Sequence, residues 1–132
     1  MKTRRCDDAT ARGRLRKAEQ FLDAAMDIRD LADEEADIGD AFVTLCVHAG
    51  IAAADVLCCA ALGVHAQGDD HGDAVGLLAT VRPEGEDTSK ALRVLLAMKT
   101  KAAYSPKAVG GDDRKRALRS VERLVTAARD RI

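Results

Sequence analysis

One stretch of the chain is apolar on every side, within a sequence that is otherwise crowded with charges. With histidine counted as neutral, residues 41–66 contain a single charged side chain, that of Asp55. A helix that is apolar all round is buried on all sides. The stretch therefore predicts a central, buried helix over residues 41–64.

The other apolar residues recur at three- and four-residue spacing, the pattern of amphipathic helices. We expect four such helices: residues 9–36, residues 73–81, a segment from Thr88 or Ser89 to Tyr104, and a segment from Asp112 or Asp113 to the C-terminus. Phe21, Phe42 and Tyr104 are the only aromatic residues, and this scarcity argues against a sheet. The sequence thus predicts an all-α, single-domain bundle of about five helices, with residues 1–8 as a flexible N-terminus.

Positive charge gathers at both ends of the chain. Residues 1–20 and 90–132 together carry a net charge of +12, whereas residues 21–89 carry −13. If the first and last helices lie side by side, they form a basic flank that attracts an anionic partner. The alternatives are pairing between oppositely charged helices of one chain, or head-to-tail packing of two copies.

The cysteines and the chain start indicate a cytoplasmic protein. Cys46, Cys58 and Cys59 lie in the predicted central helix, where cysteine behaves as a small hydrophobic residue. No apolar run follows the basic start, so we expect no secretory signal. The central helix is long enough to cross a bilayer, but an aspartate at the bilayer centre costs about 2.5–3.5 kcal/mol. We therefore expect no membrane association.

His48 and Asp55 are the two residues with an imidazole or a carboxyl group within the predicted central helix. They form a candidate acid–base or ligand-binding pair, because burial and pairing shift pKa values. The alternative is that each hydrogen-bonds a neighbouring helix, as buried polar groups must. Two helical turns separate them by about 10.5 Å, so direct contact is not expected.

The loop after the central helix contains Asp69, Asp70, His71 and Asp73. These side chains suit a divalent cation, but their spacing matches no standard metal loop. We expect no bound metal, and we retain His71 as a binding residue.

Lys99, Lys101, Tyr104 and Ser105 form the most suggestive surface group. Two ammonium groups and two hydroxyls at a helix end can contact a phosphate. The alternative is that the lysines simply complement the negative end of the helix dipole.

The block LRVLLAMKTKAAYSPKAVGGDDRKRALRSVERLVTAARDRI, from Leu92 to Ile132, resembles the C-terminal half of HEPN (higher eukaryotes and prokaryotes nucleotide-binding) domains. There, a helix ending in a basic turn and a tyrosine precedes a loop and a helix rich in Ala, Leu and Arg. The order of the upstream elements is similar too. The resemblance implies a helical fold, a homodimer and a setting such as a toxin–antitoxin pair.

Many HEPN proteins resemble one another in an Arg-x4–6-His ribonuclease motif. This sequence departs from it, because no Arg lies between Arg29 and Arg82 to precede His48, His65 or His71 at that spacing. We therefore expect a non-catalytic HEPN-like module without cofactor. It would bind RNA, a nucleotide or a partner protein through the Lys99–Tyr104 region.

Two further hypotheses remain open at this point. One is a divergent, metal-independent ribonuclease that uses His48 or His71 with Asp55 and a lysine. The other is a structural helical adaptor or dimerisation protein that binds no small ligand.

Overall fold

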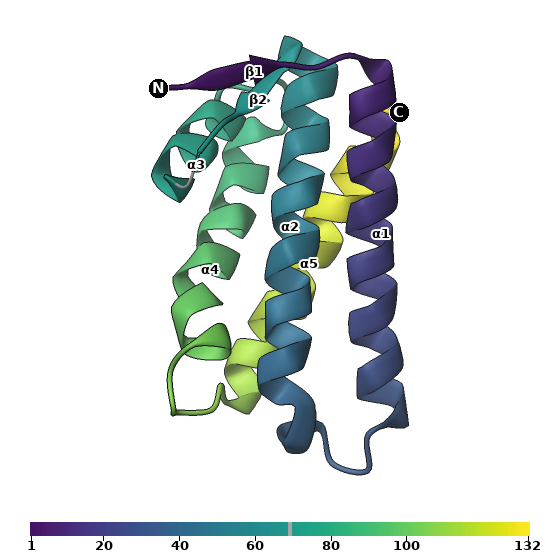
Figure 1. Ribbon diagram of the computed structural model, residues 1–132, viewed down its shortest axis with the longest axis vertical. Coiled ribbons are helices and arrows are strands. Elements are labelled where there is room, and N and C mark those ends of the chain that lie inside the picture. Colours follow the sequence, from purple (N-terminus) through teal and green to yellow (C-terminus); the bar gives the residue numbers. More distant parts are fainter. Residues whose placement is uncertain (69) are drawn as a thin grey trace.

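The computed structural model describes residues 1–68 and 70–132 and confirms the all-α class (Figure 1). The described residues form five α-helices: α1 (Asp8–Leu31), α2 (Gly39–Leu62), α3 (His71–Ala79), α4 (Gly85–Ala103) and α5 (Gly111–Asp130). A short 3-10 helix, η1 (Glu35–Ile38), precedes α2.

The apolar helix α2 is the centre of the bundle. It packs against α1, α4 and α5, and α3 packs mainly against α4. Most of its side chains are buried, although His48 and the last residues of the helix reach the surface. Gly50 lets α4 and α5 approach α2, because a Cβ there would collide with the Leu95 side chain and lie 3.3 Å from that of Leu124. The predicted central helix is therefore confirmed, but it is not buried on every side.

The helix ends differ from those expected by a few residues. The first helix ends at Leu31 rather than residue 36, because the acidic residues that follow oppose the negative end of the helix dipole. Helix α3 begins at His71, since the Asp70 carboxylate caps it by accepting from the backbone N–H of Gly72 at 2.9 Å. Helix α4 begins at Gly85, and the Thr88 hydroxyl donates to the Glu84 carbonyl instead of capping a later start.

Two short strands were not expected. Residues 1–8 contain β1 (Thr3–Arg5), which pairs antiparallel with β2 (Val64–Ala66) directly after α2. The chain turns at Gly63, whose φ of 72° is a left-handed conformation that favours glycine. The ribbon lays β1 across the end of the bundle where α1 begins and α2 ends (Figure 1).

One helical segment of the described residues, Glu35–Leu62, is long and apolar enough to cross a membrane. In the bundle, 61% of its most apolar window is buried. The core helix of a soluble protein passes the same test, so the segment is weak evidence for a membrane location.

Candidate functional sites

His48 and Asp55, expected as a pair inside the core, face different surroundings. His48 is exposed, and its ring lies 5.6 Å from that of Phe21 on α1. Asp55 is half-buried and contacts Arg14 and His65 instead. The structure therefore does not bring the two candidate residues together as one site.

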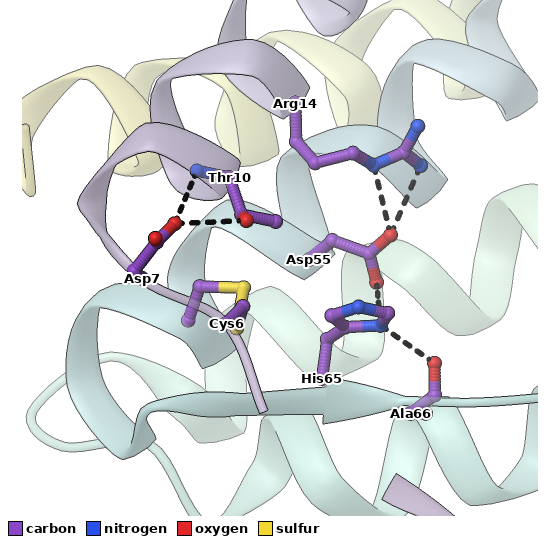
Figure 2. The surroundings of a disulfide bond; sticks show 8 residues. Cys6, Asp7, Thr10, Arg14, Asp55, His65 and Ala66 are labelled. Carbon is purple, nitrogen blue, oxygen red and sulfur yellow. Dashed lines mark hydrogen bonds and ion pairs between the residues drawn. A yellow bond between two sulfur atoms is a disulfide. The ribbon is translucent and has the colours of Figure 1, made fainter. Parts of the chain in front are cut away.

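Asp55 lies between a guanidinium and an imidazole (Figure 2). Its Oδ2 accepts a hydrogen bond from Nε of Arg14 at 3.0 Å and forms an ion pair with Nη2 of the same residue at 2.9 Å. Its Oδ1 lies 4.0 Å from Nδ1 of His65. That nitrogen lies 2.9 Å from the Ala66 carbonyl, which can only accept, so Nδ1 carries the proton and donates to it.

The environment of Asp55 acts on its pKa in two directions. Burial raises the pKa of this carboxyl above its usual range, and the positive charge of Arg14 opposes the rise. The remaining exposure of the Asp55 side chain is 19%. Burial outweighs the charge of Arg14 in its effect on this pKa, and the contacts of Asp55 join α2 to α1 and β2.

A disulfide joins Cys6 to Cys59 beside this cluster (Figure 2). The two residues are 53 positions apart in the sequence, with their Cα atoms 5.6 Å apart. The Cys6 backbone N–H also donates to the Gly63 carbonyl at 3.0 Å. The N-terminal segment is thus fastened to the end of α2 by a covalent bond that the sequence reasoning did not predict.

Cys46 and Cys58 are free and buried. Burial raises the pKa of each thiol to about 12. A thiol with so high a pKa holds almost no thiolate at neutral pH, and the thiolate is the reactive form. Both behave as core residues, as the sequence indicated.

His71 and Lys99, which the sequence placed in different candidate groups, meet in the fold. Lys99 Nζ lies 2.9 Å from His71 Nε2, so the ammonium donates to the imidazole nitrogen. The contact joins the first residue of α3 to α4. Among the described residues, no group of three His, Cys, Asp or Glu is placed to hold a metal ion. Asp69, a member of the loop considered for a cation, lies outside the described residues.

The four residues Lys99, Lys101, Tyr104 and Ser105 have different surroundings. Whereas Lys99 turns to α3, Lys101 Nζ lies 3.5 Å from the Asp113 carboxylate in the first turn of α5. Tyr104 is 77% exposed. Ser105 Oγ accepts from the backbone N–H of Lys107 at 3.1 Å, within the loop that leads to α5. The four residues share one end of α4, but they do not converge on a common point.

The basic side chains of α5 fall into two groups. The cations after the middle of the helix pair with acids of other elements: Arg123 with Asp87, Arg129 with Glu19, and Arg131, just past the helix end, with Glu84. The cations of the first half make no ion pair with the described residues: Arg114, Lys115, Arg116 and Arg119. Pairing between oppositely charged helices therefore accounts for one half of α5 and leaves the other half uncompensated.

Sequence reasoning missed Arg14, His65 and the disulfide as parts of one cluster. The only signal in the sequence was that Asp55 needed a partner, because a half-buried carboxylate in an apolar helix is costly alone.

Comparison with protein-family models, with curated proteins and with solved structures found no match. The resemblance to HEPN domains thus stays a prediction from the residues that carry it.

Proposed function

We propose that this chain is a helical module that binds RNA through the end of α4 and the first half of α5. The observation that carries the proposal is the contrast within α5: its later arginines are paired with acids, whereas its first four cations are free to meet phosphates. Clustered, uncompensated Lys and Arg side chains are the electrostatic footprint of nucleic-acid binding.

An exposed aromatic side chain supports the same surface. Tyr104 ends α4, and the Lys101–Asp113 contact fastens that end to the first turn of α5. Single-stranded RNA is commonly held by basic side chains that follow its backbone and by aromatic rings on which bases stack. The end of α4 and the first half of α5 supply both kinds of group at the same end of the bundle (Figure 1).

The resemblance to HEPN domains agrees with this proposal, and with a homodimer. A non-catalytic module is proposed because the sequence lacks the Arg-x4–6-His ribonuclease motif. If the chain nevertheless cleaves RNA, the His71–Lys99 contact is the arrangement to test. Cleavage in EDTA that is lost in His71→Ala would replace the binding module by a ribonuclease.

The test is binding of fluorescently labelled single-stranded RNA, measured by anisotropy at several salt concentrations. We expect a double variant, Arg116→Gln with Arg119→Gln, to weaken binding and to flatten its salt dependence. Each phosphate contact contributes about 0.7 to the slope of log K against log salt for single strands, so loss of two contacts lowers the slope by about 1.4. Tyr104→Ala should cost about 1–3 kcal/mol per stacked base.

A matched control removes two positive charges elsewhere. Lys90 and Arg93 are exposed on α4, and their replacement by glutamine changes the net charge equally. If this control weakens RNA binding as much as the α5 double variant does, attraction is diffuse and the assigned surface is wrong. If the unaltered protein binds no RNA at low salt, the proposed function fails.

A further inference from the structure

A pocket opens at the end of the bundle where α1 ends and α2 and α5 begin, at the foot of the ribbon in Figure 1. Its volume is about 340 Å³. Small-molecule pockets in proteins span roughly 300–1,000 Å³, so this one suits a small ligand. Arg114 and Lys115 of the first half of α5 line it, whereas Arg116 and Arg119 do not.

The pocket is lined by both positively charged and apolar side chains. Arg29 comes from α1, and Arg114 and Lys115 come from the first turns of α5. The apolar contacts are those of Ile38, Phe42 and Leu118. Glu35 is the one acidic residue of the lining. Three cations against one carboxylate leave the pocket positive, and the N-terminus of α5 adds to that potential.

The Arg114 side chain lies close to backbone glycines rather than to an acid. Its side chain lies over two glycines: a Cβ on Gly39 would come within 3.2 Å of Arg114 Cδ, and one on Gly111 within 3.6 Å of Nη2. A hydrogen bond ties the loop before α5 to the start of α2, because Asp40 accepts from the backbone N–H of Val109 at 2.9 Å. Among residues 1–68 and 70–132, Arg114 makes no ion pair.

Arg29 is the second guanidinium of the pocket. Its Nε and Nη2 both lie 3.2 Å from Asp30 Oδ1, the neighbouring residue on α1. This contact satisfies one edge of Arg29 and orients the group. Guanidinium groups bind carboxylates and phosphates through paired hydrogen bonds, so Arg29 and Arg114 suit an oxyanion between them.

From this geometry we infer a binding site for a small amphiphilic anion, with a carboxylate or phosphate head between Arg29 and Arg114 and an apolar body on Ile38, Phe42 and Leu118. The apolar part of the lining explains why the ligand is not a bare inorganic ion, since a hydrated ion gains nothing from contact with apolar side chains. The three cations of the lining explain why it is not a neutral apolar molecule. The site goes beyond the proposed RNA surface and does not depend on it.

The test is calorimetric titration with four probes: octanoate, octyl phosphate, octanamide and inorganic phosphate. We expect saturable binding of octanoate or octyl phosphate, and at least tenfold weaker binding of both octanamide and inorganic phosphate. The tighter of the two amphiphilic probes identifies the preferred head group. Equal affinity for octanoate and octanamide, or no saturation by either anion, overturns the inference.

Variants locate the site. Arg114→Gln should weaken binding of the tighter probe at least tenfold, and Glu35→Gln should strengthen it several-fold by removing the one negative charge of the lining. Arg93→Gln is the matched control and should leave the affinity unchanged. Amide chemical shifts of Gly39 and Gly111 report the site directly, even if a variant folds poorly. Binding that ignores Arg114→Gln and leaves both amides unmoved contradicts the assignment.

The same variants separate the two proposals. Arg116→Gln with Arg119→Gln should weaken RNA binding but leave probe affinity unchanged. If the unaltered protein binds the amphiphilic probe but no RNA, only the RNA proposal is overturned. RNA binding without any probe binding would overturn only the pocket.

Discussion

Reduction of the Cys6–Cys59 disulfide should remove a large part of the stability of the bundle. The bond closes a loop of 53 residues. In the chain-entropy description, opening a loop of that length lowers the free energy of unfolding by about 4 kcal/mol, because the unfolded chain regains the freedom that the bond removed. Whole domains are stable by only about 5–15 kcal/mol, so the loss should be plain in a denaturation curve.

The assay is urea unfolding followed by circular dichroism, with and without a phosphine reductant. A thiol count in denaturant comes first: two free thiols are expected before reduction, those of Cys46 and Cys58, and all four cysteines after it. The matched control is the double variant Cys6→Ala with Cys59→Ala, whose unfolding curve should not respond to reductant. Four thiols before reduction, or identical curves for the unaltered protein with and without reductant, would refute the reasoning.

Limited proteolysis distinguishes the local release of β1 from unfolding of the whole bundle. The pairing of β1 with β2 covers only three residues on each strand, and an isolated two-stranded hairpin is marginally stable in water. After reduction, β1 should therefore become the first site of trypsin cleavage, at Arg4 or Arg5, while the helices still resist. Cleavage there at the same rate before reduction would show that the bond does not restrain the segment.

Two further predictions concern packing and charge in the core. Gly85→Ala should destabilise by about 1–3 kcal/mol through overpacking, because its Cβ would lie 2.5 Å from the Leu78 carbonyl; Gly76→Ala, with open space around it, should stabilise by about 0.5–1 kcal/mol. Arg14→Met should destabilise by about 1–3 kcal/mol at neutral pH by leaving the Asp55 carboxylate uncompensated, and adding Asp55→Asn should recover most of that loss. Burial raises the pKa of Asp55 above 3.8 in the folded protein. The contribution of Asp55 to the free energy of unfolding is therefore greatest below pH 3.8, and it falls as the pH rises through the pKa of the folded state. Removal of the Arg14 charge raises this pKa further, so in Arg14→Met the fall should extend to higher pH. Urea unfolding between pH 4 and 8 checks both pairs, and a flat pH profile in Arg14→Met would contradict the second.

The bundle could be predicted because its signal is repeated along the chain. The apolar run around Gly50 predicts a buried helix, and the spacing of apolar residues on α1, α4 and α5 predicts what covers it. The helix ends differ from the prediction by a few residues, since a cap depends on which side chain turns back to the backbone. Asp70 rather than Asp73 caps α3, and both residues are equally suitable by type.

The strands and the disulfide could not be predicted for a different reason. Each strand has three residues, and all those of β1 are exposed, so neither produces a periodic pattern. Adjacent residues of a helix point in different directions, and Cys58 is buried in the core whereas Cys59 forms the disulfide. The partner of Cys59 depends on where the N-terminus lies, and no local pattern records that.

The charge pattern shows how far composition carries a functional argument. Counting charges predicted basic ends, but it could not tell which cations are already satisfied within the chain. That depends on the path of α5, whose second half runs beside the acids of α1 and of the start of α4, Glu19 and Asp87. The cations of its first half meet no such acid among the described residues. Within α5, the cations that make no ion pair with the described residues are thus confined to the first half, and there both the RNA surface and the anion pocket are proposed.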